Sequence, residues 1–135
     1  MKAEELMIGD YVHVKPSGML IKVTAVHRKK VAYNAVINKL AWVRESLLQP
    51  IPLERIHLIK NGFRVREDTD DTEYFYYDGY TINVDFYEGL PEDDIPPTIF
   101  LSIDFAEKDI AMPIEYVHEL QQAMRIMGCD KEIEI

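Results

Sequence analysis

The segment from Gln49 to Phe63 constrains the fold most, because it stiffens the chain, starts a helix and ends it within a few residues. Pro50 and Pro52 lack a backbone N–H and hold the residues before them in extended conformations. Gly62 stands where a helix commonly ends in positive φ. Between them, three apolar residues recur at helical spacing: Leu53, Ile56 and Ile59. We therefore predict a stiff connector and short helix over residues 49–62, with an apolar side that packs into both flanking units.

Before this connector, short runs of alternating apolar and polar residues are separated by turn residues. Val12 and Val14 are expected to face one side of a strand, with Tyr11 and His13 on the other. Four or five short strands in so few residues predict a small SH3-like β-barrel over residues 1–48. The predicted strands are Tyr11–Lys15, Leu20–Val26, Val31–Ile37 and Leu40–Leu48. A unit this short buries little, so we expect it to pack with the remainder of the chain as one body.

After the connector, residues 63–135 predict an acidic α+β unit. Four runs indicate an antiparallel sheet, with an Asp78-Gly79 hairpin turn: Phe63–Glu67, Tyr74–Tyr77, Tyr80–Glu88 and Ile99–Phe105. A helix is expected from Pro113 or Ile114 to near Gly128, covering one face of this sheet, with His118 on its solvent side. Glu132–Ile135 predicts a last edge strand.

The charge of the chain is uneven. The total is −9, yet residues 1–48 carry 8 Lys and Arg against 4 Asp and Glu, whereas the remainder carries 7 against 20. A negative chain repels nucleic acid at long range, and only the N-terminal unit escapes that argument. The apolar runs are too short for a membrane span, and the acidic N-terminus lacks a signal core. The single cysteine, Cys129, rules out an internal disulfide and favours a reducing cytoplasm.

Residues suited to catalysis or metal binding do not form a recognisable motif, so no catalytic, metal or cofactor residue is predicted. His13, His27, His57 and His118 lack metal-ligand spacing. The acidic run Asp68–Glu73 lacks the central glycine of a calcium loop, and Glu92–Asp94 is interpreted as a solvated loop in the same way.

Two further sets of residues are considered as catalytic candidates and are disfavoured. Asp85 and Asp104 are expected on the second face of neighbouring strands, where a shared pocket would make an acid–base pair. Cys129 follows a helix C-terminus, where the helix dipole disfavours a thiolate nucleophile. A metal-dependent hydrolase is therefore kept as a disfavoured alternative.

A mixture of basic and aromatic residues in the N-terminal unit is the candidate interaction surface. It consists of Arg28, Lys29, Lys30, Trp42 and Arg44, with Lys39 and Tyr33 nearby in sequence. Small barrels bind nucleic acid with such surfaces. The competing interpretation is that the lysines are solvated turn residues and that Trp42 packs under the connector.

Three blocks also resemble a known family. Glu5–Val12, Pro50–Leu53 with Asn61–Phe63, and Tyr116–Gln122 occur in the same order in a family of small proteins from Bacteroides-type gut bacteria and their phages or mobile elements. The resemblance covers nearly the whole chain and implies no particular activity.

This chain departs from the family pattern at two places. Glu54 stands where the family has threonine, which predicts a weaker helix start. Gln122, Ala123 and Met124 replace Asn-Leu-Tyr, so no aromatic contact is expected from that part of the helix.

Taken together, the sequence predicts a cytoplasmic, non-enzymatic interaction or accessory protein of mobile-element type, with no cofactor and with a protein as partner. A nucleic-acid-binding accessory protein that uses the basic barrel is the main alternative, disfavoured by the net charge. Exposed edge strands leave a homodimer open as well.

Overall fold

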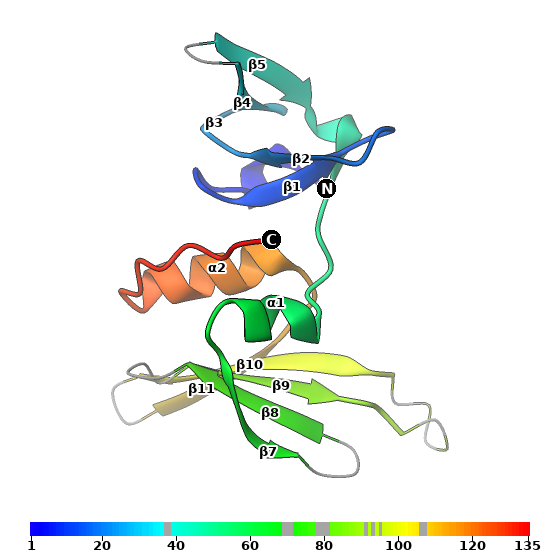
Figure 1. The fold of residues 1–135 in the computed structure, drawn as a ribbon. Coiled ribbons are helices and arrows are strands. Elements are labelled where there is room, and N and C mark those ends of the chain that lie inside the picture. Colours follow the sequence, from blue (N-terminus) through cyan, green and yellow to red (C-terminus); the bar gives the residue numbers. More distant parts are fainter. Residues whose placement is uncertain are drawn as a thin grey trace. The chain divides into compact units, whose positions relative to one another are not determined.

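The protein is described by a computed structural model that covers residues 1–36, 39–68, 72–77, 82–90, 92, 94, 96–105 and 108–135, with the backbone alone at 67–68, 104–105 and 108–110. The fold is α+β, with antiparallel sheets and one main helix, as predicted (Figure 1). The chain divides into an N-terminal unit, Met1–Pro52 with Tyr116–Gln122 and Ile135, and a C-terminal unit, Leu53–Glu115 with Ala123–Glu134. The boundary lies inside the predicted connector.

The N-terminal unit consists of short strands and two 3-10 turns. In chain order these are η1 (Ala3–Glu5), β1 (Tyr11–Val14), β2 (Met19–Lys22), β3 (Ala25–His27), β4 (Lys30–Val36), β5 (Lys39–Arg44), η2 (Glu45–Leu47) and β6 (Leu48–Gln49). The predicted strand over Leu40–Leu48 is thus broken by η2, and the predicted strand over Leu20–Val26 is split in two.

These strands form two three-stranded antiparallel sheets, ordered β2-β1-β6 and β3-β4-β5. β2 and β3 follow each other directly, because the chain changes sheet at Val23 and Thr24. The N–H of Val23 donates to the carbonyl of Asp10 at 2.8 Å, and that of Thr24 donates to Ala32 at 2.9 Å. Strands that switch sheets in this way make the corners of orthogonal packings. Among the described strands the hydrogen bonds do not close a barrel, so the SH3-like barrel stays a prediction.

The core of the N-terminal unit follows the alternation of its strands. Val12 is fully buried and Val14 nearly so, while Tyr11 and His13 between them are half-buried, as predicted. The same cluster contains six further buried side chains: Ala3, Leu6, Ile21, Val23, Val31 and Leu48. Fully burying one such valine or leucine contributes about 1.5–3 kcal/mol.

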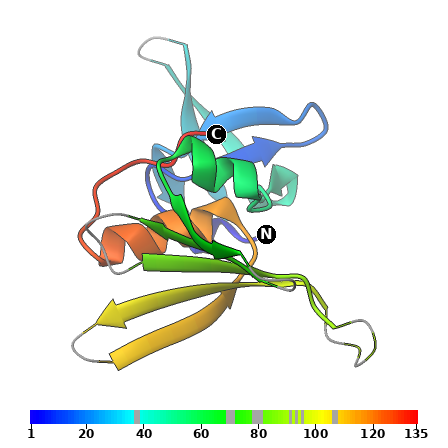
Figure 2. The same cartoon turned by 60° about the horizontal axis from the view of Figure 1, so that its bottom comes forward.

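The C-terminal unit is built on a five-stranded antiparallel meander, ordered β11-β10-β9-β8-β7, whose strands lie side by side in Figures 1 and 2. The strands are β7 (Arg64–Asp68), β8 (Thr72–Tyr77), β9 (Ile82–Tyr87), β10 (Thr98–Phe105) and β11 (Lys108–Ile114). One cross-strand row, Phe75, Val84 and Leu101, is fully buried. Helix α1 (Arg55–Lys60) belongs to this unit, as do the residues of helix α2 (Val117–Ile126) from Ala123 onward. The predicted Asp78-Gly79 turn lies outside the described residues.

Helix α1 ends where it was expected to end, but it buries a different residue. Gly62 has φ +86°, and the N–H of Phe63 donates to the carbonyl of Leu58 at 3.0 Å. Leu58 is fully buried, whereas Ile56 and Ile59 are 59% and 56% exposed. The predicted apolar side was therefore wrong for these two isoleucines, because a six-residue helix presents one narrow face and Leu58 occupies it.

The region before α2 is a strand and not a helix. Residues 108–114 pair with β10 as the edge strand β11, where Pro113 opposite Phe100 is tolerated because an edge strand has one side without ladder bonds. The helix begins only at Val117, and its start is capped by the N–H of Tyr116 donating to Oε1 of Glu119 at 3.0 Å.

The predicted last strand, Glu132–Ile135, was also wrong. The backbone N–H and carbonyl of Glu134 form hydrogen bonds with the side-chain amide of the buried Asn61. Its Nδ2 donates to the Glu134 carbonyl at 2.8 Å, and its Oδ1 accepts from the Glu134 N–H at 2.7 Å. A side chain thus holds the C-terminal segment by its backbone, and residues 132–135 are not part of a β-strand.

Candidate functional site

The hairpin between β3 and β4 brings the longest basic run of the chain into one turn. His27 pairs with Lys30, which leaves Arg28 and Lys29 as the two turn residues. Arg28 has φ +54°, a left-handed conformation that costs a residue with a side chain roughly 1–2 kcal/mol. Such positions usually hold glycine, asparagine or aspartate, so the charged Arg28 occupies this position at a local cost in stability.

The next hairpin adds two more residues to the same face of the sheet. In β5, Arg44 lies opposite Lys30, and Trp42 lies opposite Ala32. His27, Lys30 and Arg44 therefore form one row across three strands. Cations placed opposite each other destabilise a sheet, since their repulsion is uncompensated. Val31 and Val43, which alternate with these residues, point to the core.

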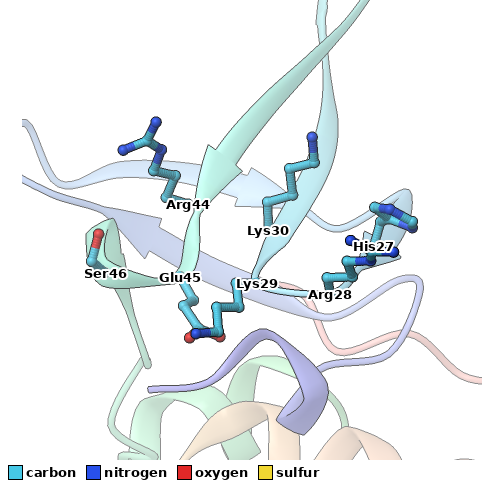
Figure 3. A pocket seen from close by; sticks show the side chains of 7 residues that line it. All are labelled: His27, Arg28, Lys29, Lys30, Arg44, Glu45 and Ser46. Atoms are coloured by element: carbon cyan, nitrogen blue, oxygen red, sulfur yellow. The ribbon is translucent and has the colours of Figure 1, made fainter.

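The β3–β4 turn and the end of β5 line an open pocket of about 660 Å³, which we call the basic pocket (Figure 3). Its size falls within the range of roughly 300–1,000 Å³ that is common for ligand sites. Four cations line it against one carboxylate: the full lining is His27, Arg28, Lys29, Lys30, Arg44, Glu45 and Ser46.

The four cations of the basic pocket form no ion pair with a described carboxylate. Within the described part of the chain, no carboxylate lies within ion-pair distance of Arg28, Lys29, Lys30 or Arg44. The carboxylate of Glu45 accepts the backbone N–H of Ala3 at 2.9 Å, and its own N–H donates to the Lys29 carbonyl at 2.8 Å. Glu45 thus ties η1 and the hairpin turn together.

Trp42 stands beside the basic pocket and is 46% exposed. The Lys30 ammonium lies 5.1 Å from the centre of its ring, and the His27 ring meets it edge-on with 6.4 Å between centroids. The expected burial of Trp42 under the connector was therefore wrong, because its β-strand position directs it to the outer face. The structure brings Arg28, Lys29, Lys30, Arg44 and Trp42 together; that they bind a partner stays a prediction.

A second, smaller pocket in the same unit was not predicted. Its volume is about 310 Å³, and it is lined by residues of β2 and β4 with Thr24. Tyr33 lines this second pocket and not the basic one, and Lys39 lines neither. The signal that sequence reasoning missed is the pair of exposed apolar residues in β2, Met19 and Leu20.

His118 lies in a buried polar cluster and not on the solvent face of α2 as predicted. Only 4% of it is exposed, its ring stacks on Tyr116, and its Nδ1 has no hydrogen-bond partner. Burial lowers its pKa, against the opposing effect of Asp10, Glu119 and Glu5. The side chain of Gln122 packs here too: its Nε2 donates to Oδ2 of Asp10 at 2.7 Å and to the carbonyl of Glu5 at 2.9 Å.

The carboxylate pair proposed for acid–base work does not meet. In the sheet register, Asp85 lies opposite Phe100, four residues before Asp104 on β10. At about 3.4 Å per residue this separates the two positions by roughly 13 Å along the strand. Burial raises the pKa of Asp85, with Arg66 opposing the shift, and its Oδ1 has no hydrogen-bond partner. The disfavoured alternative of a shared acid–base pocket for Asp85 and Asp104 was therefore wrong.

The remaining candidates are placed as follows. Cys129 is buried, and Glu73 is paired with Arg55. Asp70, Asp71 and Asp93 lie outside the described residues. No group of His, Cys, Asp or Glu arranged to hold a metal ion is found among the residues that the structure describes. No helix in that part of the chain is long and apolar enough to cross a membrane.

Comparison of the chain with protein-family models, with curated proteins and with solved structures finds no match. The functional argument therefore depends on the geometry of the basic pocket.

Proposed function

We propose that this chain is a non-enzymatic binding protein whose N-terminal unit holds an anionic partner in the basic pocket. The observation that carries the proposal is the set of four cations, Arg28, Lys29, Lys30 and Arg44, around one open pocket without an ion-pair partner among the described carboxylates. An anion placed there interacts favourably with all four, and its attraction offsets their mutual repulsion.

The local arrangement supports a site that is kept for binding. Lys30 faces Arg44 across the strands, and Arg28 holds a left-handed conformation, so each feature costs stability. Strained or repulsive features of this kind cluster at functional sites. Glu45, the acid that lines the pocket, accepts the Ala3 N–H and so helps to hold the turn in place.

The broader setting of the proposal follows from the sequence. A single, buried cysteine supports a reducing cytoplasm as the working compartment. The resemblance to small proteins of mobile elements supports an accessory role. The change of sheet at Val23 and Thr24 and the 3-10 turn η2 before β6 support an SH3-like, partly open barrel for the N-terminal unit.

A polyanion tests the proposal without assuming the natural partner. The full chain is applied to immobilised heparin at low salt and eluted with a salt gradient. The double variant Lys29→Gln with Lys30→Gln is compared with Lys15→Gln and Lys39→Gln, which removes the same charge from exposed positions outside the pocket.

We expect the pocket variant to elute at clearly lower salt than the control variant, because it loses two of the four cations that act together. Equal elution of the two variants would show that binding follows net charge alone, and failure of the wild-type chain to bind heparin would refute the proposal.

A further inference from the structure

We infer that the anionic partner is single-stranded nucleic acid, with phosphates in the basic pocket and a base stacked on Trp42. This inference depends on the proposed function and adds the chemical class of the ligand. Proteins that bind single strands combine a basic groove for the backbone with aromatic side chains on which bases stack. Both parts are present on one face of the β3-β4-β5 sheet.

The position of Trp42 favours nucleic acid over other anionic ligands. An acidic peptide needs only cations, whereas an indole that is 46% exposed adds a planar apolar surface next to them. Lys30 links the two parts, since it lines the basic pocket and also holds its ammonium 5.1 Å from the Trp42 ring centre. The indole and the Lys30 ammonium of the pocket are thus within one nucleotide's reach of each other.

The charge argument against nucleic acid weakens when the N-terminal unit is considered by itself. The N-terminal unit carries 8 Lys and Arg against 5 Asp and Glu, Glu119 of its second segment included, and four of those acids are not in the pocket lining. At physiological salt, charges farther apart than about 8 Å are largely screened. The local surface, and not the total of −9, decides contacts at this site.

The chain provides its own reporter, because Trp42 is its single tryptophan. The full chain is titrated at low salt with a ten-nucleotide oligothymidylate, with a duplex of the same length and with polyglutamate, while tryptophan fluorescence is recorded. We expect the single strand to quench the fluorescence and to bind with a log–log salt slope of about −2 to −3, as four or fewer phosphate contacts predict.

Variants then separate stacking from charge. Trp42→Ala is expected to weaken binding of a fluorescein-labelled oligothymidylate by roughly 5- to 150-fold in an anisotropy assay, while Trp42→Phe keeps an aromatic ring and most of the affinity. Leu40→Ala is the matched control, because Leu40 is another large exposed apolar residue on β5 and does not line the pocket. Circular dichroism confirms that each variant is folded.

Each outcome decides between the two proposals. Quenching by the single strand, together with a loss in Trp42→Ala but not in Leu40→Ala, supports the inference. Equal or tighter binding of polyglutamate or duplex, or unchanged affinity in Trp42→Ala, overturns the inference while the anion-binding function stands. Binding of none of the three probes by a chain that does bind heparin overturns the inference alone, and failure to bind heparin as well refutes both.

Discussion

Two groups of cations, one in each unit of the molecule, differ in whether a carboxylate neutralises them. In the C-terminal unit, Arg55 is neutralised locally: its Nε lies 2.7 Å from Oε2 of Glu73, and its Nη2 lies 3.8 Å from Oε1 of Glu88. In the N-terminal unit, Lys30 faces another cation, Arg44, across the strands. The difference teaches that net charge is a poor guide to function, because cations held by carboxylates support the fold and those without such partners remain available to a ligand.

The comparison requires that the units can be perturbed separately, and core truncation tests this. Phe75→Ala removes a fully buried ring that packs edge-on against Phe86 at 5.7 Å between centroids. We expect a loss of about 3–5 kcal/mol in the free energy of unfolding. Phe100→Ala, in the same sheet but 38% exposed, is the control and is expected to cost under ~1.5 kcal/mol.

Two probes show whether that loss reaches the other unit. Trp42 fluorescence reports on the N-terminal unit, and far-ultraviolet circular dichroism reports on the whole chain. If the units fold as one body, as the sequence predicts, Phe75→Ala shifts both denaturation midpoints together. A shift in the dichroism midpoint alone would show that the units unfold independently.

A buried acid of the N-terminal unit gives the next largest effect. Asp10 is fully buried, and its Oδ2 accepts the Met7 N–H at 2.8 Å and the Gln122 amide at 2.7 Å. Asp10→Ala strands these donors and is expected to cost about 1–3 kcal/mol in chemical denaturation. Anion binding by the folded variant is expected to be unchanged, because Asp10 does not line the basic pocket.

The contact of Asp10 with Gln122 also shows which parts of the fold the sequence could not predict. Alternation predicted the burial of Val12 and Val14, and the turn Arg28-Lys29 was visible because hairpin signals are local. The burial of His118 was not visible, because it depends on packing of α2 against a segment more than a hundred residues earlier, through Gln122 and Asp10. Periodicity shows which residues share a face of an element, but it does not show which face packs against the remainder of the protein.

The same limit explains the two errors at the ends of elements. Pro113 was interpreted as a helix start, yet its pairing partner Phe100 places it in an edge strand. The side chain of Asn61 binds the backbone of the C-terminal segment, and no local sequence pattern predicts that long-range contact. In the site, Arg44 and Trp42 joined the turn residues because strand register, which sequence suggests only loosely, placed them on its face.

Acidification is expected to destabilise the protein through two histidines, the buried His118 and the half-buried His57. Burial lowers the pKa of His118 and of His57 below the usual 6.5, and Lys60 lowers that of His57 further while Glu54 opposes it. A depressed folded-state pKa contributes stability that is present above pH 6.5 and is lost as the pH falls through the folded value. His57 also loses its Nδ1 as acceptor of the Glu54 N–H, now at 3.0 Å.

His118→Gln tests the contribution of His118 to this effect. The difference in unfolding free energy between pH 7.5 and pH 5.5 is expected to shrink in this variant, whereas His13→Gln, which removes an imidazole from the same unit, serves as the control. An unchanged difference in His118→Gln would show that other groups carry the acid sensitivity.

Removing Glu73, the ion-pair partner of Arg55, tests directly whether paired and unpaired cations differ in anion binding. Glu73→Gln leaves Arg55 without its closer carboxylate and is expected to cost at most about 1 kcal/mol, because the guanidinium is half exposed. We expect no gain in oligonucleotide affinity, since Arg55 does not line the basic pocket. A tighter complex would mean that any unpaired cation of this chain binds anions, and the contrast between the two units would fail.

Replacing the strained turn residue separates stability from binding within the basic pocket itself. Arg28→Asn removes a cation but places at φ +54° a residue that tolerates this conformation. We therefore expect the unfolding free energy to rise by about 0.5–1 kcal/mol, while the affinity for polyanions falls severalfold.

Lys29→Asn is the matched control, because it removes the same charge from the other turn residue, whose φ is not positive. Its affinity for polyanions is expected to fall without a gain in stability. Equal stability of the two variants would show that the arginine conformation carries no cost, and the argument that this turn is kept for binding would then depend on its charges alone.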